Sequence, residues 1–67
     1  MINIMVNGDA IKVEESLSLK SYINGIGFDL KKVAIEVNRE IVPKSEYINM
    51  VLKENDELEI VHFIGGG

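Results

Sequence analysis

The stretch "MINIMVNGDAIKVE", residues 1–14, decides the fold, because it predicts two strands joined by a tight turn. Apolar residues occupy every second position on both sides of its centre: Ile2, Ile4 and Val6 before it, and Ile11 and Val13 after it. That two-residue period is typical of strands with one buried face. Asn7-Gly8 at the centre accepts the positive φ angles that a type I′ turn requires. We therefore expect the chain to begin with a β-hairpin.

The period changes after the hairpin to that of a helix. The apolar stripe with i, i+3, i+4 and i+7 spacing consists of Leu19, Tyr22, Ile23 and Ile26. Ser18 stands directly before it as a candidate N-cap, and Gly25 and Gly27 follow as helix-ending residues. Because so short a helix is marginal by itself, we expect it to be stabilised by packing its stripe on the sheet.

Strand patterns return in the second half of the chain. Residues 33–38, "VAIEVN", alternate again, "NRE" predicts a turn, and "IVP" at 41–43 predicts a short strand that ends near Pro43. A single helical turn around Ser45–Tyr47, a short extended piece and a polar turn in "KENDE" are expected next. The last strand is "ELEIVHF", residues 57–63. This order predicts an α+β fold in which a mixed sheet of four to five strands packs on one helix.

Length and composition indicate one small domain without covalent crosslinks. The chain has 67 residues, no cysteine and 46% hydrophobic residues, so packing alone must stabilise it. We expect residues 1–64 to form the domain and residues 65–67, three consecutive glycines, to form a flexible tail. A glycine tail is also the kind of backbone that enters a slot too narrow for a Cβ atom.

The charge and the N-terminus narrow the class of partner. A net charge of -4, with the basic residues scattered among the acids, disfavours nucleic acid and favours a basic protein partner, although the charge would also serve solubility alone. No apolar run approaches the roughly 20 residues of a membrane span, and residues 1–10 do not resemble a signal peptide. We therefore expect a cytoplasmic protein that binds no membrane and is a monomer when free.

The side chains offer little for catalysis. His62 is the only histidine, so a histidine cluster for a metal or a triad cannot be assembled, and a structural role is expected for it. The acidic run Glu54, Asp56, Glu57 and Glu59 lacks the spacing of a calcium loop and is interpreted as a solvated turn and strand face. No glycine pattern of a phosphate-binding loop is present. We predict no catalytic residue and no metal site.

The final strand carries the most informative exposed residues. If Leu58 and Ile60 face the core, then Val61 and Phe63 share the outward parity of Glu57 and Glu59. Exposed apolar residues beside a mobile end predict a docking surface for a partner. The alternative is that a bulge or bend ends the alternation and Phe63 curls back over the sheet edge.

Several of these stretches together resemble one family of known proteins. The segments "VNREIVPKSEY" (37–47) and "NDELEIVHFIGGG" (55–67), with the opening "VNG", are similar to the thiamine-biosynthesis sulfur carriers of the ThiS family, within the ubiquitin-like β-grasp superfamily. The resemblance runs nearly end to end. The third glycine, Gly65, departs mildly from the family's Gly-Gly ending without changing the last two positions.

The resemblance implies a function in which the chain itself is not an enzyme. A ThiF-type adenylyltransferase would use ATP and Mg²⁺ to adenylate the carboxylate of Gly67, while Gly65 and Gly66 thread into its active site. A persulfide on a sulfur-donating enzyme would then convert the adenylate into a thiocarboxylate, and a ThiG-type thiazole synthase would receive the sulfur. The chain would bind no cofactor of its own.

Two alternatives remain open from the sequence. One is a molybdopterin-type sulfur carrier or a ubiquitin-like modifier of lysines, although the molybdopterin carriers typically are longer and have prolines before Gly-Gly. The other is a β-grasp binding module with incidental glycines. The mass of the protein from its native cell distinguishes them, because a thiocarboxylate has one oxygen replaced by sulfur.

Overall fold

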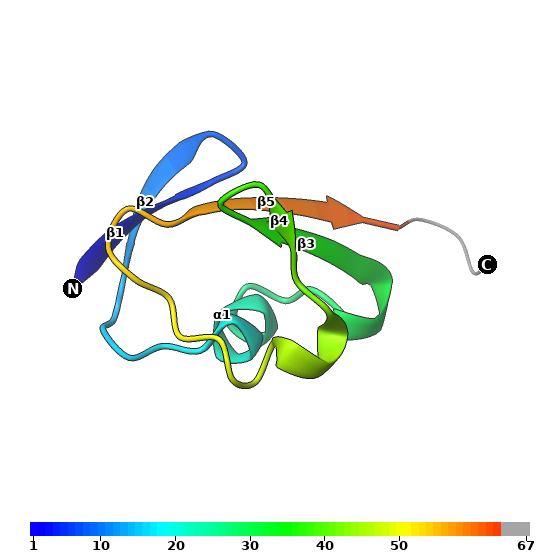
Figure 1. Ribbon diagram of the computed structural model, residues 1–67. Coiled ribbons are helices and arrows are strands. Elements are labelled where there is room, and N and C mark those ends of the chain that lie inside the picture. The colour runs from blue at the N-terminus through cyan, green and yellow to red at the C-terminus, as the bar shows by residue number, and fades with distance from the viewer. Residues whose placement is uncertain (64–67) are drawn as a thin grey trace.

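A five-stranded mixed sheet covers one face of a single α-helix in the computed structural model, which describes residues 1–63 (Figure 1). The strands are β1 (Ile2–Val6), β2 (Asp9–Val13), β3 (Val33–Val37), β4 (Glu40–Ile41) and β5 (Glu57–His62). The helical segments are α1 (Leu19–Gly25) and the 3-10 turns η1 (Leu30–Lys32) and η2 (Lys44–Glu46). The strand order is β2-β1-β5-β3-β4, and only the β1–β5 pair is parallel within these residues. The predicted mixed sheet on one helix is confirmed.

The first hairpin forms as the sequence predicts. Asn7 has a φ of 49° and Gly8 a φ of 87°, the left-handed pair of a type I′ turn. Ile4 is opposite Ile11 in the antiparallel register, so the apolar parities of β1 and β2 meet on one face.

The Asn7 side chain extends this turn into a long-range contact. Its Oδ1 accepts from the backbone N–H of Ile60 at 2.7 Å, and its Nδ2 donates to the Ile60 carbonyl at 3.2 Å. Its own backbone N–H donates to the Leu58 carbonyl at 2.9 Å. The side-chain amide of Asn7 thus continues the hydrogen bonding between β1 and β5 beyond the end of β1. These contacts hold β5 beside β1.

Asn7→Ala is expected to lower the free energy of unfolding by about 1–3 kcal/mol, because the part-buried Ile60 amide loses its acceptor. Asn7→Gly is the matched variant, since glycine adopts the positive φ without the strain of alanine, while the same hydrogen bonds are lost. Urea unfolding of both variants measures the two contributions. Equal stability of Asn7→Gly and the wild type would show that the amide contacts contribute nothing.

The second hairpin uses the same turn without glycine. Asn38 and Arg39 have φ angles of 53° and 71°, and β4 is shorter than the predicted strand over residues 41–43. Val42 lies outside β4, yet its side chain is buried and its N–H donates to the Ile35 carbonyl at 3.0 Å. Pro43 is the N-cap of η2, and because it has no N–H the hydrogen bonding to β3 stops after Val42.

The helix starts where predicted and ends before its stripe is complete. The Ser18 Oγ accepts from the backbone N–H of Ser21 at 3.1 Å, and Leu19 and Ile23 are fully buried. Ile26 was expected on the buried stripe, but it is 45% exposed because α1 ends at Gly25 and Ile26 serves as the C-cap. The predicted helical turn near Ser45–Tyr47 is η2, whereas η1 was not predicted.

The core lies between the inner face of the sheet and α1, closed on one side by the segment after β4. Its buried members are Ile4, Val13, Leu19, Ile23, Val33, Ile35, Val37, Val42, Tyr47, Leu52, Leu58 and Ile60. The segment from Val42 to Leu52 contributes three of them and is tied to the helix entrance, since the Leu19 N–H donates to the Met50 carbonyl at 2.7 Å.

Candidate functional site

The last described residues lie at the end of a central strand. β5 pairs with β1 on one side and with β3 on the other, and His62 is opposite Val33 at the start of β3. The Phe63 N–H then donates to the Lys32 carbonyl at 2.7 Å. The chain is therefore held to the sheet up to Phe63. The predicted tail glycines Gly65, Gly66 and Gly67 lie outside the described residues.

Alternation along β5 continues to its end. Leu58 and Ile60 are buried, whereas Val61 is 58% and Phe63 50% exposed. β5 keeps one antiparallel register with β3 from Leu58 to His62, so no bulge interrupts the pattern. The exposure that the parity predicted for Val61 and Phe63 is thus observed, together with that of Glu57 and Glu59. Docking by these four residues stays a prediction.

His62 shares the parity of the core residues and makes a packing contact. Its ring lies 5.3 Å from that of Phe28, centroid to centroid, at an interplanar angle of 26°. Offset stacking of this kind stabilises an aromatic pair. The contact joins the end of β5 to the loop before η1 and gives His62 a structural role.

The outer face of the sheet brings further residues beside Glu57 and Glu59. Glu36 on β3 is directly opposite Glu59, and Ile41 on β4 is opposite Glu36. Met5 on β1 pairs with Glu57 in the parallel register. Like charges directly opposite each other destabilise a sheet, so the Glu36–Glu59 pair favours a cationic group supplied from outside. Sequence reasoning missed Glu36, although the parity of residues 33–37 places it outward.

Two members of the acidic run serve the loop before β5. Glu54 accepts from the backbone N–H and the Nδ2 of Asn3, both at 3.0 Å, and these hydrogen bonds lower the pKa of Glu54. Asp56 accepts from the Asn38 Nδ2 at 3.0 Å and from the Lys53 N–H at 2.8 Å. Both carboxylates hold the loop in place by these hydrogen bonds. Of the acidic run, only Glu57 and Glu59 lie on the exposed face of β5.

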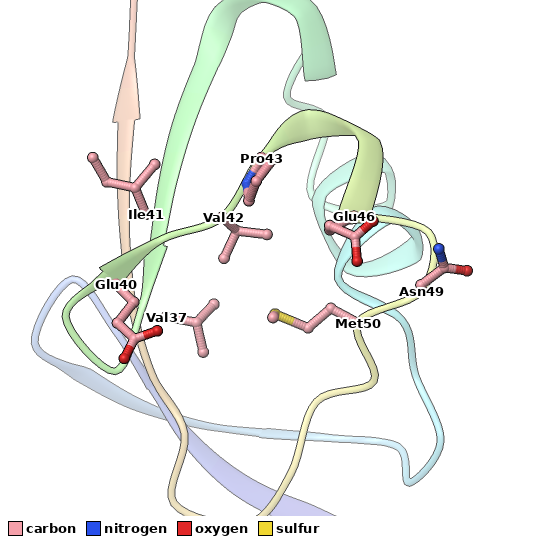
Figure 2. A pocket seen from close by; sticks show the side chains of 8 residues that line it. All are labelled: Val37, Glu40, Ile41, Val42, Pro43, Glu46, Asn49 and Met50. Carbon is pink, nitrogen blue, oxygen red and sulfur yellow. The ribbon is translucent and has the colours of Figure 1, made fainter.

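One cavity of about 290 Å³ opens between β4 and the segment after η2. Figure 2 shows Met50 pointing across it toward Val37 and Val42, with the Glu40 carboxylate on the β4 side. Val37 is opposite Leu58, which lies four residues before His62 on β5. At the rise of a strand, about 3.3 Å per residue, this end of β3 is therefore about 13 Å from His62. The cavity is therefore separate from the end of β5.

No group of three or more His, Cys, Asp or Glu side chains that could hold a metal ion is found among residues 1–63. In the same range, no helix has the length and apolarity needed to cross a membrane.

Comparison with known proteins gives concordant similarities. A sequence model described as the ThiS family matches residues 4–67. The chain is 41% identical over 66 residues to a thiazole synthase of Paramagnetospirillum magneticum, covering 98% of this chain and 20% of that protein. The identity and both coverages are the same for a thiazole synthase of Magnetococcus marinus. The chain therefore spans a fifth of the length of these two relatives.

Two relatives match along their whole length. The sulfur carrier protein ThiS of Bacillus subtilis is 32% identical over 65 residues, which cover 96% of this chain and 98% of that protein. The crystal structure of the thiamine biosynthesis protein ThiS from Geobacter metallireducens superposes with a TM-score of 0.83 at 28% identity, covering 98% of this chain and all of that one. The fold is therefore the ubiquitin-like β-grasp of that protein.

Proposed function

The chain belongs to the ThiS family, and from that membership we propose that it is a sulfur carrier protein of thiamine biosynthesis. The observation that carries the proposal is the family match over residues 4–67, which includes the whole glycine run. The end-to-end similarity to the Bacillus sulfur carrier supports it.

The proposed chemistry takes place at the Gly67 carboxylate. A carboxyl of this type is ionised at neutral pH, so its oxygen can attack the α-phosphate of ATP and release pyrophosphate. The resulting acyl adenylate makes the carbonyl carbon electrophilic, and the terminal sulfur of a persulfide displaces AMP. Cleavage of the remaining sulfur–sulfur bond by a thiol leaves the thiocarboxylate. The carrier supplies the carboxylate, and partner enzymes supply the catalytic groups, ATP and Mg²⁺.

Three partners follow from this chemistry. A ThiF-type adenylyltransferase activates Gly67, a persulfide enzyme donates the sulfur, and a ThiG-type thiazole synthase accepts it. Support for the last partner comes from the two thiazole synthases that contain a segment similar to this chain. Gly65 and Gly66 are proposed to enter the partner active sites, where a backbone without Cβ atoms needs the least room.

The intact mass of the protein isolated from its native cell tests the proposal. A fraction of the molecules is expected to carry sulfur in place of one oxygen at Gly67, and tandem fragmentation locates the change to the last residue. The fraction is expected to disappear in cells that lack the adenylyltransferase. An unmodified carboxylate under conditions of active thiamine synthesis would contradict the proposal, and attachment to lysines would favour a protein modifier.

We also propose that the outer face of β5 is the docking surface for the adenylyltransferase. Val61 and Phe63 supply apolar contacts beside the entrance of the tail into the partner. Glu57 and Glu59 supply charge for basic partner residues, helped by Glu36 directly opposite Glu59. Apolar anchors carry most of the energy of an interface, whereas peripheral charges mainly accelerate encounter.

Phe63→Ala is expected to weaken adenylyltransferase binding by about 1 kcal/mol or more without changing the melting temperature, because the ring is half-exposed. Glu57→Lys is expected chiefly to slow association and to make it less sensitive to salt. Stopped-flow association at two ionic strengths separates the effects, and Val51→Ala, 45% exposed outside this face, is the control. A lowered melting temperature with unchanged affinity for Phe63→Ala would assign Phe63 to the core.

A further inference from the structure

A second surface feature lies on the helix side of the molecule, where α1, η1 and η2 meet. Here a groove of about 360 Å³ is lined by Leu30, Tyr47 and Ile48 as its apolar part and by Lys20, Lys31 and Lys44. Ile48 is 60% exposed, although it is a large aliphatic residue. In Figure 1, η2 is the yellow-green turn beside α1, on the helix side of the sheet. Lys44 of η2 and Lys20 of α1 both line the groove.

The charge of this lysine groove runs against that of the chain. The chain carries a net charge of -4, yet the groove lining holds three lysines and no acid. The nearby acids are Asp29, whose carboxylate accepts from the Lys31 N–H at 2.9 Å, and Glu46 of η2. Burial raises the pKa of Tyr47, so its phenol stays neutral and offsets none of the positive charge.

Backbone contacts hold the groove together. The Lys20 N–H donates to the Tyr47 carbonyl at 3.0 Å, which joins α1 to the segment after η2. The Lys44 Nζ donates to the Lys31 carbonyl at 2.9 Å, which joins η2 to η1. The lysines are far apart in the sequence, at positions 20, 31 and 44. These contacts bring them together around the apolar part of the groove.

The groove is also tied to the end of β5, where the described part of the chain stops. The Lys32 carbonyl accepts from the Phe63 N–H, and Lys31 next to it lines the groove. Any protein that encloses the residues after Phe63 must approach this end of the molecule. The enclosing protein therefore meets the lysines of η1 as well as the acidic face of β5.

We propose that the lysine groove is a second docking surface, which takes an acidic segment of the adenylyltransferase with one apolar side chain seated against Ile48 and Leu30. This inference rests on the proposed function, because it assigns the groove to the enzyme that receives the tail. Opposite charges on two faces orient the carrier during encounter, whereas a uniform charge would only attract it.

Stopped-flow association with the adenylyltransferase of the same cell, in the absence of ATP, tests the groove directly. Lys20→Glu and Lys31→Glu are each expected to slow association roughly tenfold at low salt, with little difference at high salt. Lys12→Glu makes the same charge change on the outer face of β2 and is expected to stay within about twofold of the wild type. Lys44 is left unchanged because its Nζ holds η1.

The apolar part of the proposal has its own variant. Ile48→Ala is expected to raise the dissociation rate about fivefold, as truncation of an interface anchor does, with Val51→Ala as the exposed aliphatic control. Melting curves exclude unfolding as the cause. Equal effects of Lys31→Glu and Lys12→Glu, or an unchanged dissociation rate for Ile48→Ala, would overturn the proposal.

Formation of the acyl adenylate, measured by mass in the same samples after ATP and Mg²⁺ are added, separates this inference from the proposed function. If the wild type is adenylated but the groove variants bind like the controls, the groove is not a docking surface and the proposed function stands. Groove-dependent binding without adenylation would support the docking surface and refute the chemistry. A wild type that does not associate with the enzyme would refute both.

Discussion

Adding one alanine after Gly67 is expected to reduce adenylation by the ThiF-type enzyme by roughly 100-fold or more, because displacement of a reacting group by even about 1 Å costs that much. The extension converts the Gly67 carboxylate into a peptide amide and places the new terminal carboxylate one residue further along the chain. An amide oxygen is a much weaker nucleophile toward the α-phosphate. Mass analysis of the chain after incubation with enzyme, ATP and Mg²⁺ measures the adduct directly.

The matched control adds the same alanine before Met1, whose side chain is 76% exposed, and should be adenylated at the wild-type rate. Binding of the extended chain measured without ATP shows whether the loss arises in docking or in chemistry. Adduct formation at the wild-type rate by the chain extended after Gly67 would contradict the assignment of the reacting carboxylate.

Leu58→Ala is expected to lower the free energy of unfolding by about 2–5 kcal/mol. The Leu58 side chain is 1% exposed in the central strand β5, where it is opposite Val37 on β3 and Val6 on β1. Its removal leaves a cavity at the junction of both halves of the sheet. Since a domain of this size has little stability to lose, the variant should be substantially unfolded at moderate temperature. Urea unfolding followed by circular dichroism measures the difference.

Val61→Ala is the control on the same strand, because its side chain is 58% exposed and its truncation should change stability by less than about 0.5 kcal/mol. Leu58→Met keeps the apolar volume and is expected to cost less than about 1.5 kcal/mol, which provides a folded variant if Leu58→Ala does not fold. A cost of Leu58→Ala no larger than that of Val61→Ala would show that Leu58 is not a core residue.

Several parts of the fold were predictable because they depend on interactions between near neighbours. The Asn7-Gly8 turn requires only positive φ angles at two residues, and the Ser18 cap spans three residues of one helix. The alternation that turns Leu58 inward and Phe63 outward is a property of strand geometry itself. The exposed face of β5 was therefore assigned correctly from the sequence, as was the order of the elements.

The sequence predicted Ile26 wrongly and did not predict η1, because both depend on where helical segments begin and end. Ile26 continues the apolar period of the helix, but α1 ends one residue earlier, and the side chain turns to solvent. The 3-10 turn η1 has no apolar period of its own, and it is capped by the Asp29 carboxylate. Periodicity does not reveal such segments, since they form where neighbouring elements must be joined.

The sequence by itself determined the local devices, namely the hairpin, the capped helix, the alternating last strand and the glycine run that shares the ThiS family pattern. Only the tertiary structure decided which distant residues meet. It placed β5 between β1 and β3, fixed by Asn7 across 53 positions of sequence, and so put Glu36 opposite Glu59. It also gathered lysines from three elements around one groove. Such contacts depend on strand register and on the packing of one shared core, which no local pattern encodes.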